Sequence, residues 1–284
     1  MTPESPTVRG WELGIRLRER RTQLGMTASQ VGKAARCAQA YVSGVEANKV
    51  KLPAHRLKQL VRIYEIDDTE APELENLRDL STKRGWWHEY ARILNTEFVR
   101  YLGYEAGASG LRAYCADVLH GMLQTEEYAR AVIRAGSPYV RLTEADRRVQ
   151  LRVMRQLRLD ADQPLQVTAV LTEGVIRQRV GGAEVMAKQL DHLLELGQRK
   201  TVEVRVIPFD AGAYPALGGP FQILSFAQTT LPDLAWQETL TNSDIIDQPG
   251  QVAEHAVTFA ETAEQALSVK DSCDLIRKIV KEMR

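Results

Sequence analysis

The sequence of 284 residues has little cysteine and no long apolar segment. Its cysteines, Cys37, Cys115 and Cys273, are odd in number and far apart, so they suggest neither a disulfide framework nor a metal-ligand spacing. A protein of a reducing compartment, the cytoplasm, is therefore expected. No run approaches the roughly 18 apolar residues that a membrane span needs. The first residues lack the apolar core of a secretory signal, so neither membrane insertion nor export is expected.

The motifs of common catalytic and cofactor sites are also missing. The sequence has no Gly-x-Ser-x-Gly, no phosphate-binding loop and no dinucleotide-binding glycine pattern. The histidines are scattered without zinc-ligand spacing: His55, His88, His120, His192 and His255. Glu126 and Glu127, as neighbours on a helix, would point apart and make a poor catalytic pair. We predict no catalytic residue, no metal site and no cofactor.

The chain has no net charge overall, but its basic and acidic residues are unevenly distributed along the sequence. The chain holds 37 Lys and Arg against 37 Asp and Glu. Residues 1–66 contain twelve basic and five acidic residues, a difference of +7, so residues 67–284, with 25 and 32, carry −7. Neutralisation of phosphates supplies most non-specific DNA affinity, whereas an acidic surface repels DNA. The charge division favours DNA binding through the N-terminal head alone.

Residues 24–46 have the pattern of two short helices joined by a tight turn. Gly25 suits the end of one helix, and Thr27 followed by Gln30 suits a capping box at the start of the next. The apolar positions that follow the helical period are Val31, Ala34, Ala35, Tyr41, Val42 and Val45. Such a helix-turn-helix places its second helix in the DNA major groove.

This pattern resembles the lambda-repressor-like helix-turn-helix of the xenobiotic-response-element regulators. The segments that carry the resemblance are Gly25-Met26-Thr27, Val31-Gly32 and Tyr41-Val42-Ser43-Gly44-Val45-Glu46. Two positions depart from it. Arg36 stands at the usual turn glycine, which predicts a turn that is either less sharp or slightly strained. Ala38 stands at the usual Ser or Thr cap of the recognition helix, which gives up a cap worth about 1 kcal/mol. The resemblance also implies that Glu46 serves structure rather than DNA contact.

The resemblance places the base-reading positions at Gln39, Ala40 and Gly44. Only Gln39 can make a bidentate contact, to adenine, so direct readout is thin and DNA shape or a paired half-site is expected to contribute. Four side chains in and after the motif suit phosphate contacts: Tyr41, Ser43, Lys49 and Lys51. Arg16 and Arg20, four residues apart on the first helix, suit a clamp on the DNA backbone. The predicted DNA-binding set is Arg16, Arg20, Thr27, Gln39, Ala40, Tyr41, Ser43, Gly44, Lys49 and Lys51.

The pattern of apolar residues predicts an α+β fold in two domains. The helix-turn-helix domain covers residues 1–68, with a loose arm over 1–9 and helices over 10–24 and 54–64 around the motif. The effector domain covers 69–284, helical over 69–160 and α/β over 161–284. Its expected strands are 165–171, 201–209, 221–226 and 234–239, a small sheet of about four strands. Its expected helices include 70–84, 173–180, 183–197, 249–266 and 269–283.

Three features of the effector domain suggest contacts. The apolar stripe over residues 275–283 is a candidate homodimer interface. The arginines at 147, 148, 152, 155 and 158 of one helix form either a solvated or ion-paired face or a receptor for an acidic surface. The adjacent tryptophans 86 and 87 either pack the junction between the domains or line a pocket. The predicted ligand or partner pocket comprises Trp86, Trp87, Gln124, Tyr128, Arg152, Phe209 and Phe221.

The body is similar to an uncharacterised effector domain that follows such heads in many actinobacterial regulators. The stretches 121–130, 151–156, 181–190, 206–212 and 219–221 carry the likeness, with His120 where a proline is frequent. Proteins of this kind resemble antitoxin-like developmental regulators, often encoded beside a small acidic partner protein. The resemblance implies transcription control and a protein partner.

Three functions are consistent with the sequence. The first is a regulator that binds double-stranded DNA, as a homodimer on two half-sites, and whose body receives a protein or small-molecule signal. The second is an antitoxin-like protein that neutralises a small acidic partner and regulates its own operon. The third is an enzyme tethered to DNA. The first is the prediction.

Overall fold

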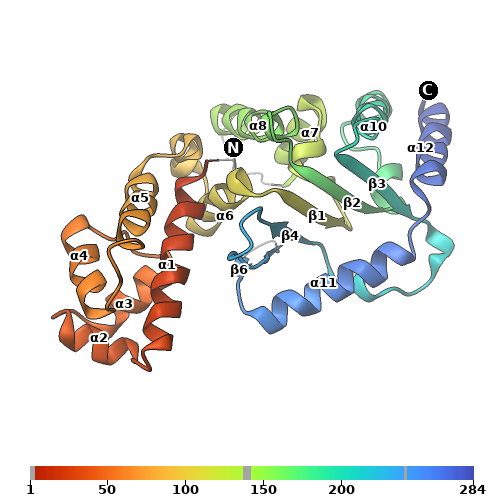
Figure 1. Ribbon diagram of the computed structural model, residues 1–284. Coiled ribbons are helices and arrows are strands. Elements are labelled where there is room, and N and C mark those ends of the chain that lie inside the picture. The colour runs from red at the N-terminus through yellow and green to blue at the C-terminus, as the bar shows by residue number, and fades with distance from the viewer. Residues whose placement is uncertain (1–3, 137–141, 240–241) are drawn as a thin grey trace.

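The protein consists of a helical head and an α+β body that share their first helix (Figure 1). The computed structural model describes residues 4–136, 142–239 and 242–284. In the view of Figure 1 the head lies at one end of the molecule, and the body is a sheet with helices on both faces. The predicted α+β class is confirmed.

The head is a bundle of five helices around its own apolar core. These are α1 (Pro6–Gln23), α2 (Ala28–Ala34), α3 (Gln39–Glu46), α4 (Ala54–Ile63) and α5 (Ala71–Thr82). Leu74 and Leu77 of α5 are buried in the same cluster as Leu17, Val42 and Leu57. The predicted domain boundary at residue 68 therefore falls inside a packed bundle, because α5 completes the core of the head rather than bridging to the body.

The N-terminal turns of α1 belong to the body. The helix begins at Pro6 with a buried Ser5 as its N-cap, so the loose arm expected over residues 1–9 is wrong from Ser5 onward, and residues 1–3 lie outside the described part. Val8 and Trp11 are buried in the main core of the body. The helix α6 (Thr96–Gly107) approaches α1 closely, since a Cβ on its Gly103 would lie 2.0 Å from a Thr7 oxygen.

A mixed sheet of six strands forms the centre of the body. The strands are β1 (Gly110–Cys115), β2 (Gln166–Thr172), β3 (Val202–Ile207), β4 (Phe221–Ser225), β5 (Leu234–Glu238) and β6 (Ser243–Ile246). Their order across the sheet is β3-β2-β1-β4-β5-β6. The first three are parallel, and β4, β5 and β6 continue the sheet as antiparallel neighbours on the other side of β1.

Alternate side chains of the strands fill two separate cores, as the two-residue period of a strand requires. Leu111, Val167 and Val204 point into the larger core, beneath the helices on the upper side of the sheet in Figure 1. Tyr114 and Val170 point into a smaller core on the other face of the sheet, which also contains Phe259.

The remaining elements are η1 (Trp86–Ile93), η2 (Gly121–Leu123), α7 (Glu126–Gly136), α8 (Leu142–Gln156), η3 (Leu157–Leu159), α9 (Glu173–Arg177), α10 (Ala183–Leu196), η4 (Phe209–Ala211), η5 (Pro215–Gly218), α11 (Pro249–Glu264) and α12 (Val269–Met283).

Two expectations for the body are wrong. The range 69–160, expected to be helical, contains the central strand β1, so the body does not divide into a helical and an α/β part. β6 is a further strand that the sequence did not predict. Residues 137–141 of that range lie outside the described residues.

The stripe of α12 is not a dimer interface. Ile276, Ile279 and Val280 are buried in the body's main core, because α12 packs against α10 and β3.

Candidate functional site

The entry into the helix-turn-helix follows the local signals of the sequence. Gly25 has a φ of 65°, the left-handed conformation that ends α1. The capping box of α2 is present: the Gln30 amide donates to Thr27 Oγ1 at 3.2 Å, and the Thr27 amide donates to Gln30 Oε1 at 2.7 Å. Both predictions are confirmed.

The turn between α2 and α3 keeps its shape without the usual residues. Arg36 has a φ of 51°, the conformation that a glycine would adopt without steric cost. Ala38 begins α3 with no side-chain hydrogen bond. The predicted strain and the missing cap are therefore both present. The turn is held by tertiary packing, because Val31, Ala35 and Val42 on either side of it are buried in the head core.

The inner side of α3 is fixed against α1 by a partly buried ion pair. Arg21 donates through Nε to Glu46 Oε1 at 2.7 Å and through Nη2 to Glu46 Oε2 at 3.0 Å. Such bidentate geometry fixes orientation as well as distance. A Cβ on Gly14 of α1 would lie 2.5 Å from the Glu46 carbonyl, so the two helices touch at backbone distance. This places Glu46 in the structure of the head, as the resemblance implied.

The opposite side of α3 is free to meet DNA. Gln39, Ala40 and Ser43 are exposed there, and Lys49 and Lys51 are exposed in the loop that follows. A surface that contacts DNA must be exposed to solvent, and these five predicted residues meet that requirement. Exposed cations that the prediction omitted extend the basic surface of the head: Lys33 on α2, Arg36 in the turn and Lys58 on α4. The charge count of the head was the only sign of them in the sequence.

Two of the residues predicted on α3 have structural roles instead. The Tyr41 hydroxyl is buried and lacks a hydrogen-bond partner among the described residues, so it does not reach a phosphate. Burial also raises the pKa of Tyr41, and the Arg56 guanidinium lies 5.9 Å from its ring centroid. Gly44 is required by a close contact, because a Cβ there would lie 2.7 Å from Val50 Cγ2.

The predicted clamp of α1 is occupied by contacts within the head. Arg16 makes ion pairs with Glu70 at 2.9 Å and with Glu73 at 3.0 Å. Arg20 donates to the carbonyls of Tyr64 and Glu65 at 2.9 and 2.8 Å. Both arginines therefore hold α1 against the end of α4 and the start of α5, and their guanidinium groups are already engaged within the head. Thr27 is exposed, but its hydroxyl is engaged by Gln30.

The seven residues of the predicted pocket do not meet in one place. Trp87 is buried with Tyr90, Leu102 and Leu151, and Trp86 packs partly buried against that cluster, so the tryptophans are packing residues. Phe221 is buried in the smaller core, whereas Phe209 is 68% exposed.

Of the other three pocket residues, two support the loop after β1 and the third binds α7. Tyr128 and Gln124 hold Leu119: the Leu119 amide donates to the tyrosine hydroxyl at 3.4 Å, and the glutamine amide donates to the Leu119 carbonyl at 2.6 Å. Arg152 donates to the Ala129 carbonyl at 3.1 Å, and burial lowers its pKa to about 10.

The arginines around α8 also bind inside the protein. Those at 147, 148, 152 and 158 donate to main-chain carbonyls of η1, α7 and the segment before β1. Arg155 makes a buried bidentate pair with Glu105, at 2.8 and 2.6 Å. Burial opposes ionisation of Glu105, but the charge and hydrogen bonds of Arg155 outweigh it and lower the Glu105 pKa. Of the five arginines, Arg155 alone has an ion pair among the described residues. The other four are held by main-chain carbonyls, so the helix is neither an ion-paired face throughout nor an unoccupied receptor for an acidic surface.

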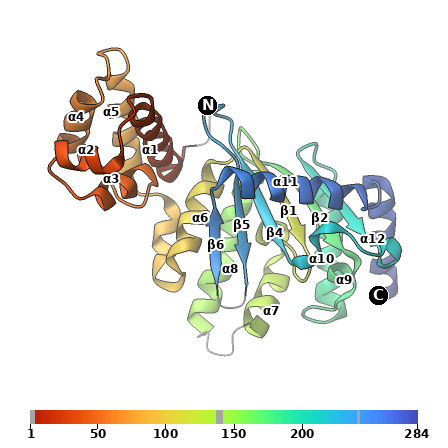
Figure 2. The same cartoon turned by 90° about the horizontal axis from the view of Figure 1, so that it is seen from below.

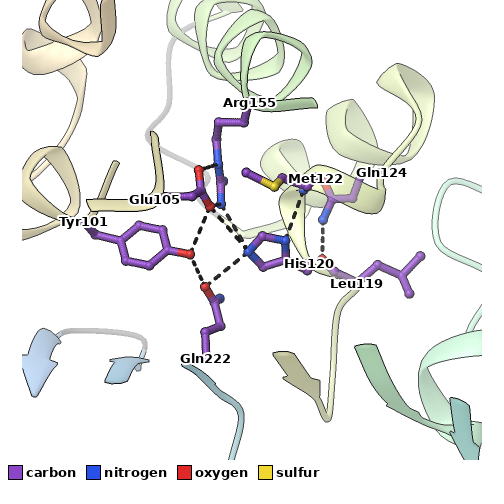
Figure 3. Close-up of polar contacts among 8 residues, drawn as sticks. All are labelled: Tyr101, Glu105, Leu119, His120, Met122, Gln124, Arg155 and Gln222. Atoms are coloured by element: carbon purple, nitrogen blue, oxygen red, sulfur yellow. Dashed lines mark hydrogen bonds and ion pairs between the residues drawn. The ribbon is translucent and has the colours of Figure 1, made fainter. Parts of the chain in front are cut away.

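His120 completes this buried network (Figure 3). The Met122 amide donates to His120 Nδ1 at 3.3 Å, which places the proton of a neutral ring on Nε2. His120 Nε2 lies 3.2 Å from Gln222 Oε1, which can accept that proton, and also 3.2 Å from Arg155 Nη2. The Tyr101 hydroxyl contacts Glu105 at 3.0 Å and also Gln222. Burial, followed by the charge of Arg155, lowers the His120 pKa to about 4. The network joins α6, α8, β4 and the loop after β1.

No cluster of three metal-ligating side chains occurs among residues 4–136, 142–239 and 242–284. In the same part of the chain, no helix has the length and apolar character to cross a bilayer.

Comparison with known proteins identifies both parts of the chain. Residues 12–74 match a helix-turn-helix domain, in agreement with the fold of the head. Residues 98–278 match a domain of unknown function, DUF5753, which covers the body from α6 into α12. No curated protein and no solved structure matches the chain significantly. The head supports DNA binding and transcription regulation, and the chain belongs to the DUF5753 family.

Proposed function

We propose that the protein is a sequence-specific transcription regulator of the lambda-repressor-like class, whose body receives a protein or small-molecule signal. The exposed outer face of α3 carries this proposal: Gln39, Ala40 and Ser43 point outward while Val42 and Val45 anchor the helix. The elements next to α3 in the chain add exposed cations: Lys33 on α2, Arg36 in the turn, and Lys49 and Lys51 in the loop that follows. Main-chain and phosphate contacts would position the head, and α3 would enter the major groove.

Base reading in this arrangement depends mainly on Gln39. Its amide can bond both N6 and N7 of adenine, whereas Ala40 offers only a methyl contact. Since Gly44 is held by Val50, it adds no base contact. Much of the specificity would then come from DNA shape and from a second half-site, which requires two copies of the chain. The α12 stripe does not supply the dimer contact, so any dimer would form elsewhere or on DNA.

The test begins with selection of host genomic fragments on the purified protein, followed by sequencing. A shared motif is expected, and recovery of fragments without one would contradict specific recognition. Gln39→Ala should then weaken binding to the selected site by about tenfold and leave the salt dependence unchanged. Gln251→Ala is the matched control, because Gln251 is exposed on α11 of the body.

The antitoxin-like alternative makes a different prediction about competition. Since the arginines of α8 are used internally, a small acidic partner would meet the exposed cations of the head, such as Lys33 and Lys58. DNA and that partner would then exclude each other. If the protein encoded beside this gene co-purifies and binds equally in the presence of operator DNA, this version of the alternative is wrong.

We also propose that the body acts by binding and not by catalysis. The richest polar cluster of its described residues, around Glu105 and Arg155, is buried, and its groups satisfy one another. Incubation with nucleotide and peptide substrates, followed by chromatography, should show no turnover.

A further inference from the structure

A groove runs between α6 and the last strand of the sheet, β6. It consists of two adjoining hollows of about 420 and 290 Å³ that share Glu97, Asn242 and Ser243. One end is bounded by Glu238 and Thr239, at the end of β5. The other end reaches Trp11 of α1 and Lys49 of the head. Figure 2 shows β6 at the margin of the sheet beside α6, on the side nearest the head.

The floor of this groove is an open edge of the sheet. β6 is last in the strand order, and in the described part of the chain no strand pairs with its outer side. The Thr239 amide donates to the Asn242 carbonyl at 2.7 Å, which makes this a hydrogen-bonded pair. Because such pairs alternate along an antiparallel ladder, Ser243 and Ile245 direct their amides and carbonyls away from β5. These groups can pair with an added strand.

The opposite edge of the sheet is closed. The Leu267 amide donates to the Val206 carbonyl of β3 at 2.8 Å, and Arg205 donates to the carbonyls of Ala266 and Leu267. The segment before α12 and Ser272 of that helix therefore occupy the outward backbone groups of Val206. The two edges differ, because β6 borders the two hollows, whereas α12 packs against β3.

The charge of the groove defines what it can accept. Glu97 is neutralised by Arg100, at 2.7 Å. Asp244 and Asp247 line the groove without an ion-pair partner among the described residues, and so does the cation Lys49. Glu238 also lacks an ion pair there, but the charges of Arg155, Arg152 and Arg148 act on it. The excess of carboxylates favours a cationic occupant. The long, narrow shape beside free strand groups favours an extended one.

We propose that this groove binds an extended, lysine- or arginine-rich segment of a partner protein, which adds to β6 as a seventh strand. Backbone bonds to Ser243 and Ile245 would hold it, and Asp244 and Asp247 would select its charge. The segment would end beside Lys49, in the loop that follows the recognition helix. The inference rests on the receiving role proposed for the body, but it is tested without DNA, so the two can fail separately.

The experiment uses the full-length protein and a labelled, end-capped heptapeptide that alternates lysine and valine. Fluorescence anisotropy should show saturable binding, and a glutamate–valine peptide of the same length should not bind. Substitution of Asp244→Lys together with Asp247→Lys should weaken binding by about tenfold or more. Glu264→Lys, on the exposed end of α11, is the matched control and should bind as the wild type does.

A second probe separates strand addition from simple charge attraction. The same peptide with N-methyl groups at alternate backbone nitrogens keeps its charge but loses the donors that face β6, so it should bind at least about tenfold more weakly. Equal affinity of the two peptides would overturn strand addition. Equal affinity for the wild type and the Asp244→Lys, Asp247→Lys variant, or no saturable binding by the wild type, would overturn the proposed site.

Discussion

The buried imidazole of His120 predicts how stability depends on pH. Its pKa is lowered to about 4 in the folded protein, whereas a histidine in an unfolded chain titrates near 6.5. The unfolded state therefore binds a proton at a pH where the folded state does not. The contribution of His120 is complete above about pH 6.5 and is lost as the pH falls toward 4. Between pH 7.5 and 5.0 the two pKa values correspond to a loss of about 2 kcal/mol in the free energy of unfolding.

The assay compares the wild type with His120→Gln by urea unfolding at both pH values. Glutamine keeps a polar group in the network but does not titrate, so the variant should lose about 2 kcal/mol less than the wild type over this interval. The other histidines are common to both proteins and cancel in the difference. If both proteins lost equal stability, the imidazole would not be buried and neutral as the contacts with Met122 and Gln222 indicate.

Three further substitutions test the packing of the head and body. Arg36→Gly should raise the free energy of unfolding by about 1 kcal/mol, because it relieves a left-handed backbone; a decrease would show that the arginine side chain supports the turn. Tyr41→Phe should leave operator affinity unchanged in an anisotropy titration, since the hydroxyl is buried, and weaker binding would restore it as a phosphate contact. Glu105→Gln should cost about 3–5 kcal/mol in urea unfolding, because it leaves Arg155 buried without a countercharge; a cost below about 1 kcal/mol would contradict the buried pair.

The helix-turn-helix was predictable because its signals are local. The conformation of Gly25, the capping box from Thr27 and the structural role of Glu46 follow from residue types at short spacing. Exposure on α3 was harder to predict. The sequence does not reveal that Val50 returns to cover Gly44 or that Arg56 lies over Tyr41, since both contacts depend on how the following loop and helix fold back.

The errors in the body arose from contacts between distant segments. β1 is a six-residue strand between helices, and its central position comes from pairing with β2 and β4, which lie more than fifty residues further along the chain. The arginines of α8 were expected to form a charged face of that helix. Their partners are mostly main-chain carbonyls of other segments, and a sequence pattern cannot reveal such partners because every residue has a carbonyl. The stripe of α12 was identified correctly as apolar, but its partner is α10 of the same chain.

The way in which the two parts share α1 limits how the body can influence the head. Val8 and Trp11 lie in the core of the body, and Leu13 and Leu17, further along the same helix, lie in the core of the head. The Trp11 ring packs edge-on against Tyr104 of α6, with centroids 5.3 Å apart. The proposed groove is lined by that same helix, so an occupant would contact α6 directly. The helix packed into both cores is α1, and such a helix transmits displacement more readily than a flexible linker. In the proposed mechanism a displacement of α6 would therefore pass to α1, and from α1 to α3 through the Arg21–Glu46 pair.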